Sequence, residues 1–282
     1  AVYAGVGMGV VVTHRATGVV NVGQVALGMW GAFVAHEVHT SGRLVFPWAG
    51  LPAVVPLEPL NGWSSALVGL ASSVLLAVAV QWLVFRPLRR ASQLARIVAT
   101  VGLLLTVQAL IVLHFDTGTR KPDPLIPVRQ LRLGSVALPL DRVALGVAAL
   151  TVAVALAWWQ RRSLVGSALR AAAEDEVAVG LAGWSPNRLS AVGWGLGAAV
   201  TAVLVILASP SVGLSPGTFP ALLVPGLACA LVGRLESFVA TAVAGLSLGC
   251  LQALAIFVTA KPWWPVWGRS GLADALPFLV IV

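Results

Sequence analysis

Long apolar runs alternate with short polar segments along the whole chain. The clearest runs cover residues 64–85, 97–114, 142–159, 190–208 and 237–258, and shorter ones cover 1–13, 25–35, 219–232 and 272–282. A helix needs about 20 mostly apolar residues to cross the hydrocarbon core of a bilayer. The pattern therefore predicts an all-α, polytopic transmembrane bundle of about eight or nine spans, folded as a single domain over residues 1–282.

Composition supports a membrane protein. Hydrophobic residues make up 59% of the chain and charged residues only 10%, compared with roughly 25% charged residues in ordinary soluble domains. The net charge of +8 comes almost wholly from arginine, and these arginines lie at the ends of apolar runs, where they set topology. Nucleic-acid binding is therefore not expected.

The arginine distribution predicts the orientation of the bundle. The basic turn at 86–96 and the segment 161–189 are separated by two crossings, so both lie on the same side, which the positive-inside rule assigns to the cytoplasm. Counting back places His14 and Arg15 inside and the first residue outside, and leaves the 116–141 loop external. Both ends of the chain interrupt apolar runs, so we expect a fragment or one section of a fused polypeptide.

Sequence motifs for enzymatic or metal chemistry are missing. No phosphate-binding Walker A pattern occurs, and no nucleophile system is evident. The His36-Glu37-Val38-His39 sequence is one residue short of the spacing that puts two zinc ligands on one helix face. The glycine-rich stretches at 5–9 and 193–197 lie inside apolar runs, where close helix packing is the favoured interpretation. We expect neither an enzyme, nor a metal site, nor a cofactor in this chain.

Several polar residues interrupt or enter the spans. Asn21 and Gln24 lie in a break between the first two spans, where they could line a transport path or form a plain cytoplasmic turn. Gln81 and Gln108 are expected to face each other from adjacent antiparallel helices.

The segment Arg161 to Leu189 is the longest charged interruption. Residues 167–181 of this segment, which include Glu174, are mostly good helix formers and predict one short helix. Gly180 and Gly183 are expected to end it. An apolar face is expected from Ala171, Ala172, Val177, Val179 and Leu181. This helix could be seated in a groove of a cytoplasmic partner, or it could be a solvated surface helix.

Three stretches together resemble the branched-chain amino-acid ABC transporter permeases, in order and over nearly the whole chain: GVVNVGQVALGMWGAFVA (18–35), FRPLRRASQLARIVATVGLLLTVQAL (85–110) and SLVGSALRAAAEDEVAVGLAGWSPNRLSAVGWGLGAAVTAVLVIL (163–207). The third resembles the family's cytoplasmic loop and is the most specific. In the first, Asn21 and Gln24 match a family signature in which Val22 and Val25 replace the usual residues.

The resemblance implies a multi-pass subunit of the bacterial inner membrane, in an importer for branched-chain or related amino acids. A second permease subunit, two cytoplasmic ATPases that hold ATP and Mg²⁺, and an extracytoplasmic binding protein would complete the importer. It also implies that segment 161–189 is the coupling loop to the ATPases, and that Asn21 and Gln24 line the translocation path. The loop positions it singles out, together with one acid of the predicted helix, are Gly166, Arg170, Ala171, Glu174, Ala178 and Gly183.

An ATP-independent secondary transporter or channel, for a small polar solute such as urea or an amide, is the alternative. Coupling to protons or sodium would call for membrane-embedded acids or inverted repeats of broken helices. No Asp or Glu lies centrally in an apolar run, which counts against that alternative.

Overall fold

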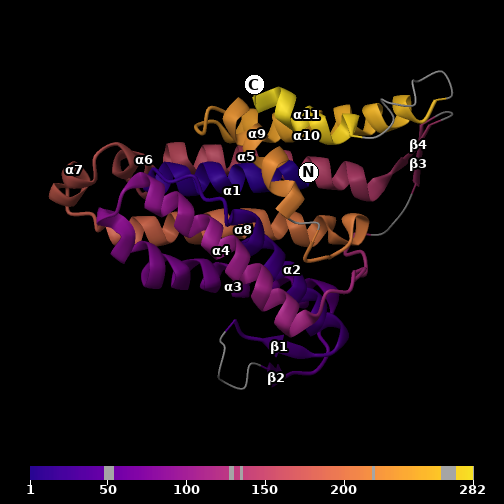
Figure 1. Cartoon of the computed structure of the whole chain (residues 1–282), viewed down its shortest axis with the longest axis horizontal. Helices are drawn as coiled ribbons and strands as arrows, with labels where there is room; N and C mark the ends of the chain where they lie inside the picture. The colour runs from indigo at the N-terminus through magenta and orange to yellow at the C-terminus, as the bar shows by residue number, and fades with distance from the viewer. Residues whose placement is uncertain (48–53, 127–129, 134–135, 218–219, 262–270, 282) are drawn as a thin grey trace.

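Helices form the body of the protein in a computed structural model, most of them near its long axis and α2 and α4 oblique to it (Figure 1). The structure describes residues 1–47, 54–126, 130–133, 136–217, 220–261 and 271–281. Its α-helices are α1 (Val2–Thr17), α2 (Gln24–Thr40), α3 (Gly62–Val80), α4 (Gln93–Phe115), α5 (Leu140–Arg162), α6 (Leu164–Glu174), α7 (Glu176–Leu181), α8 (Pro186–Val212), α9 (Leu223–Val232), α10 (Phe238–Thr259) and α11 (Leu272–Ile281). A π-helical turn η1 (Gln81–Phe85) continues α3, and two 3₁₀ turns follow as η2 (Pro87–Arg90) and η3 (Pro220–Leu222).

Five of the described helices are long and apolar enough to cross a membrane. They are α3 together with η1, α4, α5, α8 and α10. The helices α1, α2, α9 and α11 have 10 to 17 residues, which is below the usual length of a full span. The described helices thus have the length and composition of a polytopic helical membrane protein, while the count of eight or nine spans stays a prediction.

Two small β-hairpins occur in loops where only irregular chain was expected. Strand β1 (Arg43–Val45) pairs antiparallel with β2 (Val54–Pro56), and β3 (Gln130–Leu133) pairs with β4 (Val136–Pro139). These strands are rich in valine and leucine, and valine favours extended backbone. The hairpins lie in loops that connect helices, so the fold remains predominantly helical.

Helix α8 is the central element of the bundle. In its most apolar 18-residue window 72% of the residues are buried, against 17–33% in the other four candidate spans. Small residues allow this burial, because a Cβ at Gly9 of α1 or Gly28 of α2 would overlap the side chain of Thr201 in α8. The predicted role of the glycine-rich stretches in close helix packing is confirmed.

The break between α1 and α2 is shorter than the polar segment expected at 14–24. Helix α1 continues through His14 and Arg15 to Thr17, and ends where Gly18 takes the left-handed conformation with φ of 67°. Only residues 18–23 are non-helical, and α2 then runs through the His36 to His39 motif to Thr40. Because Gly18 supplies the stop, the polar residues before it are accommodated in the last turn of the helix.

The segments that the arginine pattern assigned to one side lie together at one end. Arg15 at the end of α1 donates to the carbonyl of Glu236 at 2.7 Å, and Arg89 in η2 contacts Glu176 in α7. At the opposite end Arg120 pairs with Glu37 at 2.5 Å. We call these the inner end, at the left of Figure 1 with α6 and α7, and the outer end, towards β3 and β4.

Candidate functional site

The charged segment at the inner end begins with α6, which is anchored to the body of the protein. Ser163 caps the helix by accepting a hydrogen bond from the Gly166 amide at 2.9 Å. Gly166 is buried so closely against the end of α5 that a Cβ there would lie 2.5 Å from the Cα of Gln160. Leu169 and Ala172 pack with Ala16 of α1 in a small apolar cluster. One face of α6 is therefore fixed to the membrane body.

The predicted single helix over 167–181 is in fact two helices. Helix α6 starts earlier, at Leu164, and breaks at Asp175, whose φ of −145° is not helical. The Asp175 carboxylate accepts hydrogen bonds from the amides of Val177 and Ala178 at 2.8 and 3.0 Å. A short side chain that can bond to the next two amides favours a cap over a helix interior. The break thus comes from Asp175, before either glycine.

Gly183 terminates α7, as expected. Its φ is 85°, and Trp184 and Gly183 donate backbone hydrogen bonds to the carbonyls of Val179 and Gly180. This arrangement is a Schellman ending, which requires a residue that tolerates the left-handed conformation. Gly180 itself lies within the helix.

The six loop positions singled out in the sequence do not form one surface. Gly166 is buried and Arg170 is half-buried, whereas the other four face solvent. These four are Ala171, Glu174, Ala178 and Gly183.

The apolar residues of the loop divide between two faces. Ala172 and Val179 point into the protein, so the expected common face over 171–181 is wrong. Leu164, Val177 and Leu181 are instead exposed by 79%, 73% and 87%. We refer to these three outward-facing apolar side chains together as the loop patch; they lie at an end of the bundle beyond the long apolar helices.

The break between α1 and α2 lies inside the protein and not in a solvated turn. Asn21 and Gln24 are both fully buried. The Asn21 amide nitrogen donates to Gln24 Oε1 at 3.0 Å, and Gln24 Nε2 donates to Thr201 Oγ1 of α8 at 3.1 Å. Asn21 Oδ1 has no hydrogen-bond partner among the described residues. Irregular backbone is tolerated at membrane depth where it is buried in protein or lines a cavity.

Gln81 and Gln108 do not face each other as expected. Gln108 Nε2 donates to the carbonyl of Pro216 at 3.1 Å, near the outer end. Gln81 begins the π-helical turn η1, is only 3% exposed, and leaves its Oε1 without a partner among the described residues. The two side chains lie on antiparallel helices but at opposite ends, since α3 approaches the inner end at Gln81 and α4 approaches the outer end at Gln108.

A cavity opens near each end of the bundle. The outer cavity has a volume of about 250 Å³ and is lined by residues of α2, α3, α8 and the 122–125 segment, including His36, Trp63 and Asp123. The inner cavity measures about 20 Å³ and includes Val19, Gln81, Arg96 and Ser190 among its lining residues. About 10–15 Å³ is the space that a single water requires, so the inner cavity has room for about one water.

A match to a protein-family model identifies the family of the chain. The model described as the permease component of branched-chain amino acid transport systems matches residues 1–282. The chain belongs to this family. The permease is 23% identical over 256 residues to the high-affinity branched-chain amino acid transport system permease protein BraD of Pseudomonas aeruginosa, covering 89% of this chain and 81% of the relative.

A second relative agrees with the first. The permease is 22% identical over 271 residues to the corresponding protein LivH of Escherichia coli K12, again covering 89% of this chain and 81% of the relative. No solved structure matches the chain. The permease is therefore a transport component and not an enzyme, and it is a multi-pass protein of the inner membrane.

Several residues of the site were missed in the sequence. Thr201 is the partner of Gln24, and its only signal was a polar residue inside an apolar run, which is costly unless it is paired. Arg89 was interpreted only as one of the arginines that set topology, and Asn187 was not singled out, although the structure brings both together with Glu176. Nothing in a single sequence relates positions that are about 90 residues apart.

Proposed function

We propose that the permease is one membrane subunit, folded as a single domain, of an ATP-driven importer for branched-chain or related amino acids. The α6–α7 loop would be its contact with the ATPase subunits. The loop patch carries this proposal, because three large apolar side chains exposed outside the long apolar helices call for a protein partner. The relatives are named as permeases for branched-chain amino acids, which supports the choice of cargo.

The geometry of the loop suits the transmission of motion. Its inward side is fixed by Leu169, Ala172 and Val179, and its outward side presents the loop patch. A partner that moves the loop patch therefore acts on two helices that pack on α1 and α8. Among the predicted contact positions, Ala171, Glu174, Ala178 and Gly183 lie on the accessible surface, whereas Gly166 and Arg170 support the loop from beneath.

The remaining parts of the importer would come from other chains. These are a second permease subunit, two cytoplasmic ATPases that bind ATP and Mg²⁺, and an extracytoplasmic binding protein. The bilayer would cover the exposed apolar side chains of helices such as α5 and α10, which are among the least buried of the candidate spans.

We place the translocation path at the break between α1 and α2, where polar side chains lie inside the protein. Asn21 and Gln24 bring amide groups to the level of Thr201, about halfway along α8. The free Oδ1 of Asn21 is an acceptor that a passing ammonium group could use.

A charge placed in the loop patch tests the proposed ATPase contact. Leu181→Glu should weaken ATPase association by about 2 kcal/mol or more, or roughly thirtyfold, as expected for an apolar residue at the centre of an interface. The measurement is co-purification of the ATPases together with ATP-dependent uptake of labelled leucine. Leu57→Glu is the matched control, because Leu57 is exposed at the outer end.

Three results would contradict the proposal. Unchanged ATPase association and uptake in Leu181→Glu would exclude the loop patch as the ATPase contact. Uptake in wild-type vesicles without ATP would favour a channel or secondary transporter. Uptake of urea or amides in place of leucine would change the proposed cargo.

A further inference from the structure

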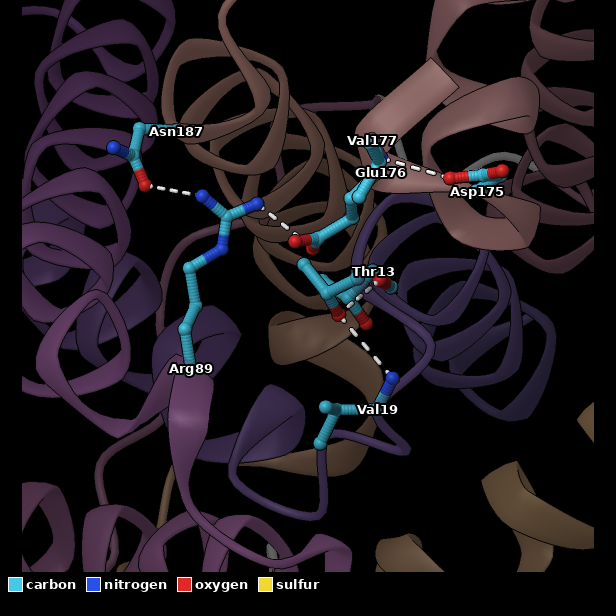
Figure 2. Close-up of polar contacts among 8 residues, drawn as sticks. Thr13, Val19, Arg89, Asp175, Glu176, Val177 and Asn187 are labelled. Atoms are coloured by element: carbon cyan, nitrogen blue, oxygen red, sulfur yellow. Dashed lines mark hydrogen bonds and ion pairs between the residues drawn. The ribbon is translucent and has the colours of Figure 1, made fainter. Parts of the chain in front are cut away.

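Arg89 joins two segments of the inner end that are far apart in the sequence. It lies in η2, the turn between α3 and α4, and its Nη2 donates to Glu176 Oε1 of α7 at 2.7 Å. Its Nη1 donates to Asn187 Oδ1 in the first turn of α8 at 2.5 Å. Figure 2 shows the guanidinium held between the two side chains, with one terminal nitrogen directed at each. The turn and the α6–α7 loop are thus linked through one side chain.

The other arginines of the turn do not make such a link. Arg86 stacks over its neighbour Trp82 at 4.7 Å, and Arg90 is exposed. Of the three ion pairs found among the described residues, only Arg89–Glu176 lies at the inner end. Arg89 therefore differs from the neighbouring arginines in its contacts, although the side chains are the same. Arg90 is for this reason a matched control.

The link lies at the inner cavity. Arg89 and Glu176 both line it, together with Val19, which follows α1, and Gln81 of η1. Val19 belongs to the same break as Asn21, so the cavity lies between the central polar residues and the inner surface. A volume of about 20 Å³ leaves space for about one water.

Two buried polar atoms beside this cavity have no partner among the described residues. Gln81 Oε1 and Arg96 Nε are buried and have no hydrogen-bond partner among the described residues, and both residues line the cavity. Buried polar atoms without partners are rare and call for an explanation. A π-helical turn such as η1 is also common where a helix serves a function. Water or cargo entering an opened cavity would supply the missing partners.

The Arg89 link has the strength expected of a contact that opens in each cycle. Its side chains are exposed by 23% in Arg89 and 49% in Glu176, and ion pairs with this much access to water are weak. Bonds to Glu176 and Asn187 together hold the turn in one place, yet displacement of α7 would remove the first of them.

We propose that Arg89 is a positioning residue that couples movement of the α6–α7 loop to opening of the inner cavity. Its bonds to Glu176 and Asn187 hold the α3–α4 turn across Gln81 and Arg96 in the closed form. When the ATPases displace α7, Arg89 releases Glu176 and the turn moves away from the cavity. This inference rests on the proposed contact between the α6–α7 loop and the ATPases.

Accessibility of a buried serine measures the opening directly. Ser190 lines the cavity and is 3% exposed, so Ser190→Cys, with Cys229→Ala and Cys250→Ala, reports access from the inner side. The assembled transporter in inside-out vesicles is treated with a membrane-impermeant maleimide, before and after addition of ATP. Arg89→Gln and Glu176→Gln should each speed the labelling without ATP, by about fivefold if only the ion pair matters and up to about thirtyfold if the second bond is also lost.

The controls separate positioning from folding. Arg90→Gln should label at the wild-type rate, and the exchange Arg89→Glu with Glu176→Arg should restore slow labelling. In Arg89→Gln the ATPases should still co-purify, while the stimulation of labelling by ATP is reduced.

Unchanged labelling in both Arg89→Gln and Glu176→Gln would overturn the inference. Failure of the ATPases to co-purify with the wild-type permease would instead overturn the proposed function. Because labelling without ATP reports only the closure of the cavity, the two failures are distinguishable.

Discussion

Thr201 is the residue on which three helices converge. Its hydroxyl accepts a hydrogen bond from Gln24 Nε2 and lies 3.1 Å from the Gly197 carbonyl of its own helix. Its side chain also occupies the space left by Gly9 of α1 and Gly28 of α2. Polar pairing and close packing are therefore combined at one position.

Removing the hydroxyl tests the polar half of this arrangement. Thr201→Val keeps the shape but leaves the Gln24 donor without its partner, which should lower the free energy of unfolding by about 1 kcal/mol. Thermal unfolding of the purified permease in detergent measures the loss. Thr201→Ser should retain most of the stability, and Thr106→Val, at an exposed threonine bonded within its own helix, should have little effect.

A methyl group tests the packing half. Gly9→Ala would place its Cβ against Thr201 and Gln24, and the forced shift should cost about 1–3 kcal/mol. Gly102→Ala is the matched change in α4, where no atom lies within 4 Å of the new Cβ. The same unfolding measurement should show equal or greater stability for Gly102→Ala, and equal losses at both positions would contradict the packing argument.

At the scale of elements, α7 depends on its two ends. A helix of six residues has few hydrogen bonds of its own, so the Asp175 cap and the Gly183 ending define it. The same short helix carries both Val177 of the loop patch and Glu176 of the link to Arg89.

Gly183→Ala tests the importance of this ending. Forcing alanine into the left-handed conformation should cost about 1–2 kcal/mol, and misplacing α7 should reduce leucine uptake while membrane insertion persists. Gly180→Ala is the control, because both glycines have open space around them and only Gly183 has a positive φ. Equal uptake by the two variants would show that the geometry of α7 does not matter.

The elements were predictable to different degrees. Apolar runs located the long helices, because span length follows from bilayer thickness. The sequence did not reveal that α1 continues past His14 and ends at Gly18, nor that Asp175 divides the segment 161–189 into two helices. A cap depends on one residue, whose effect is hard to recognise within a stretch that otherwise favours helix. For the candidate site, the sequence located the charged loop at 161–189. The pairing of Thr201, Asn187 and Arg89 with their partners could be recognised only in the folded structure.

At the scale of the whole molecule, the two ends differ in character. The inner end carries the α6–α7 loop and the inner cavity, and the outer end carries the larger cavity and the Arg120–Glu37 pair. The arginine pattern assigns the inner end to the cytoplasm.

Labelling from each side tests this orientation. In a background of Cys229→Ala and Cys250→Ala, Gly118→Cys should react with an impermeant maleimide in intact spheroplasts. Gly180→Cys should react only in inside-out vesicles. Both positions are exposed and uncrowded, so reactivity reports sidedness. The reverse pattern would invert the orientation.

The close packing of α1, α2 and α8 bears on the permeability of the subunit to protons. Glycines at 9 and 28 bring three backbones against one threonine, and a proton can cross a protein only along a connected file of water or titratable groups. Between the outer cavity and the one-water space at the inner end, the described residues interpose paired amides and packed backbone in place of such a file. We therefore expect the resting subunit to be impermeable to protons, which would let the cell maintain its transmembrane voltage between transport cycles.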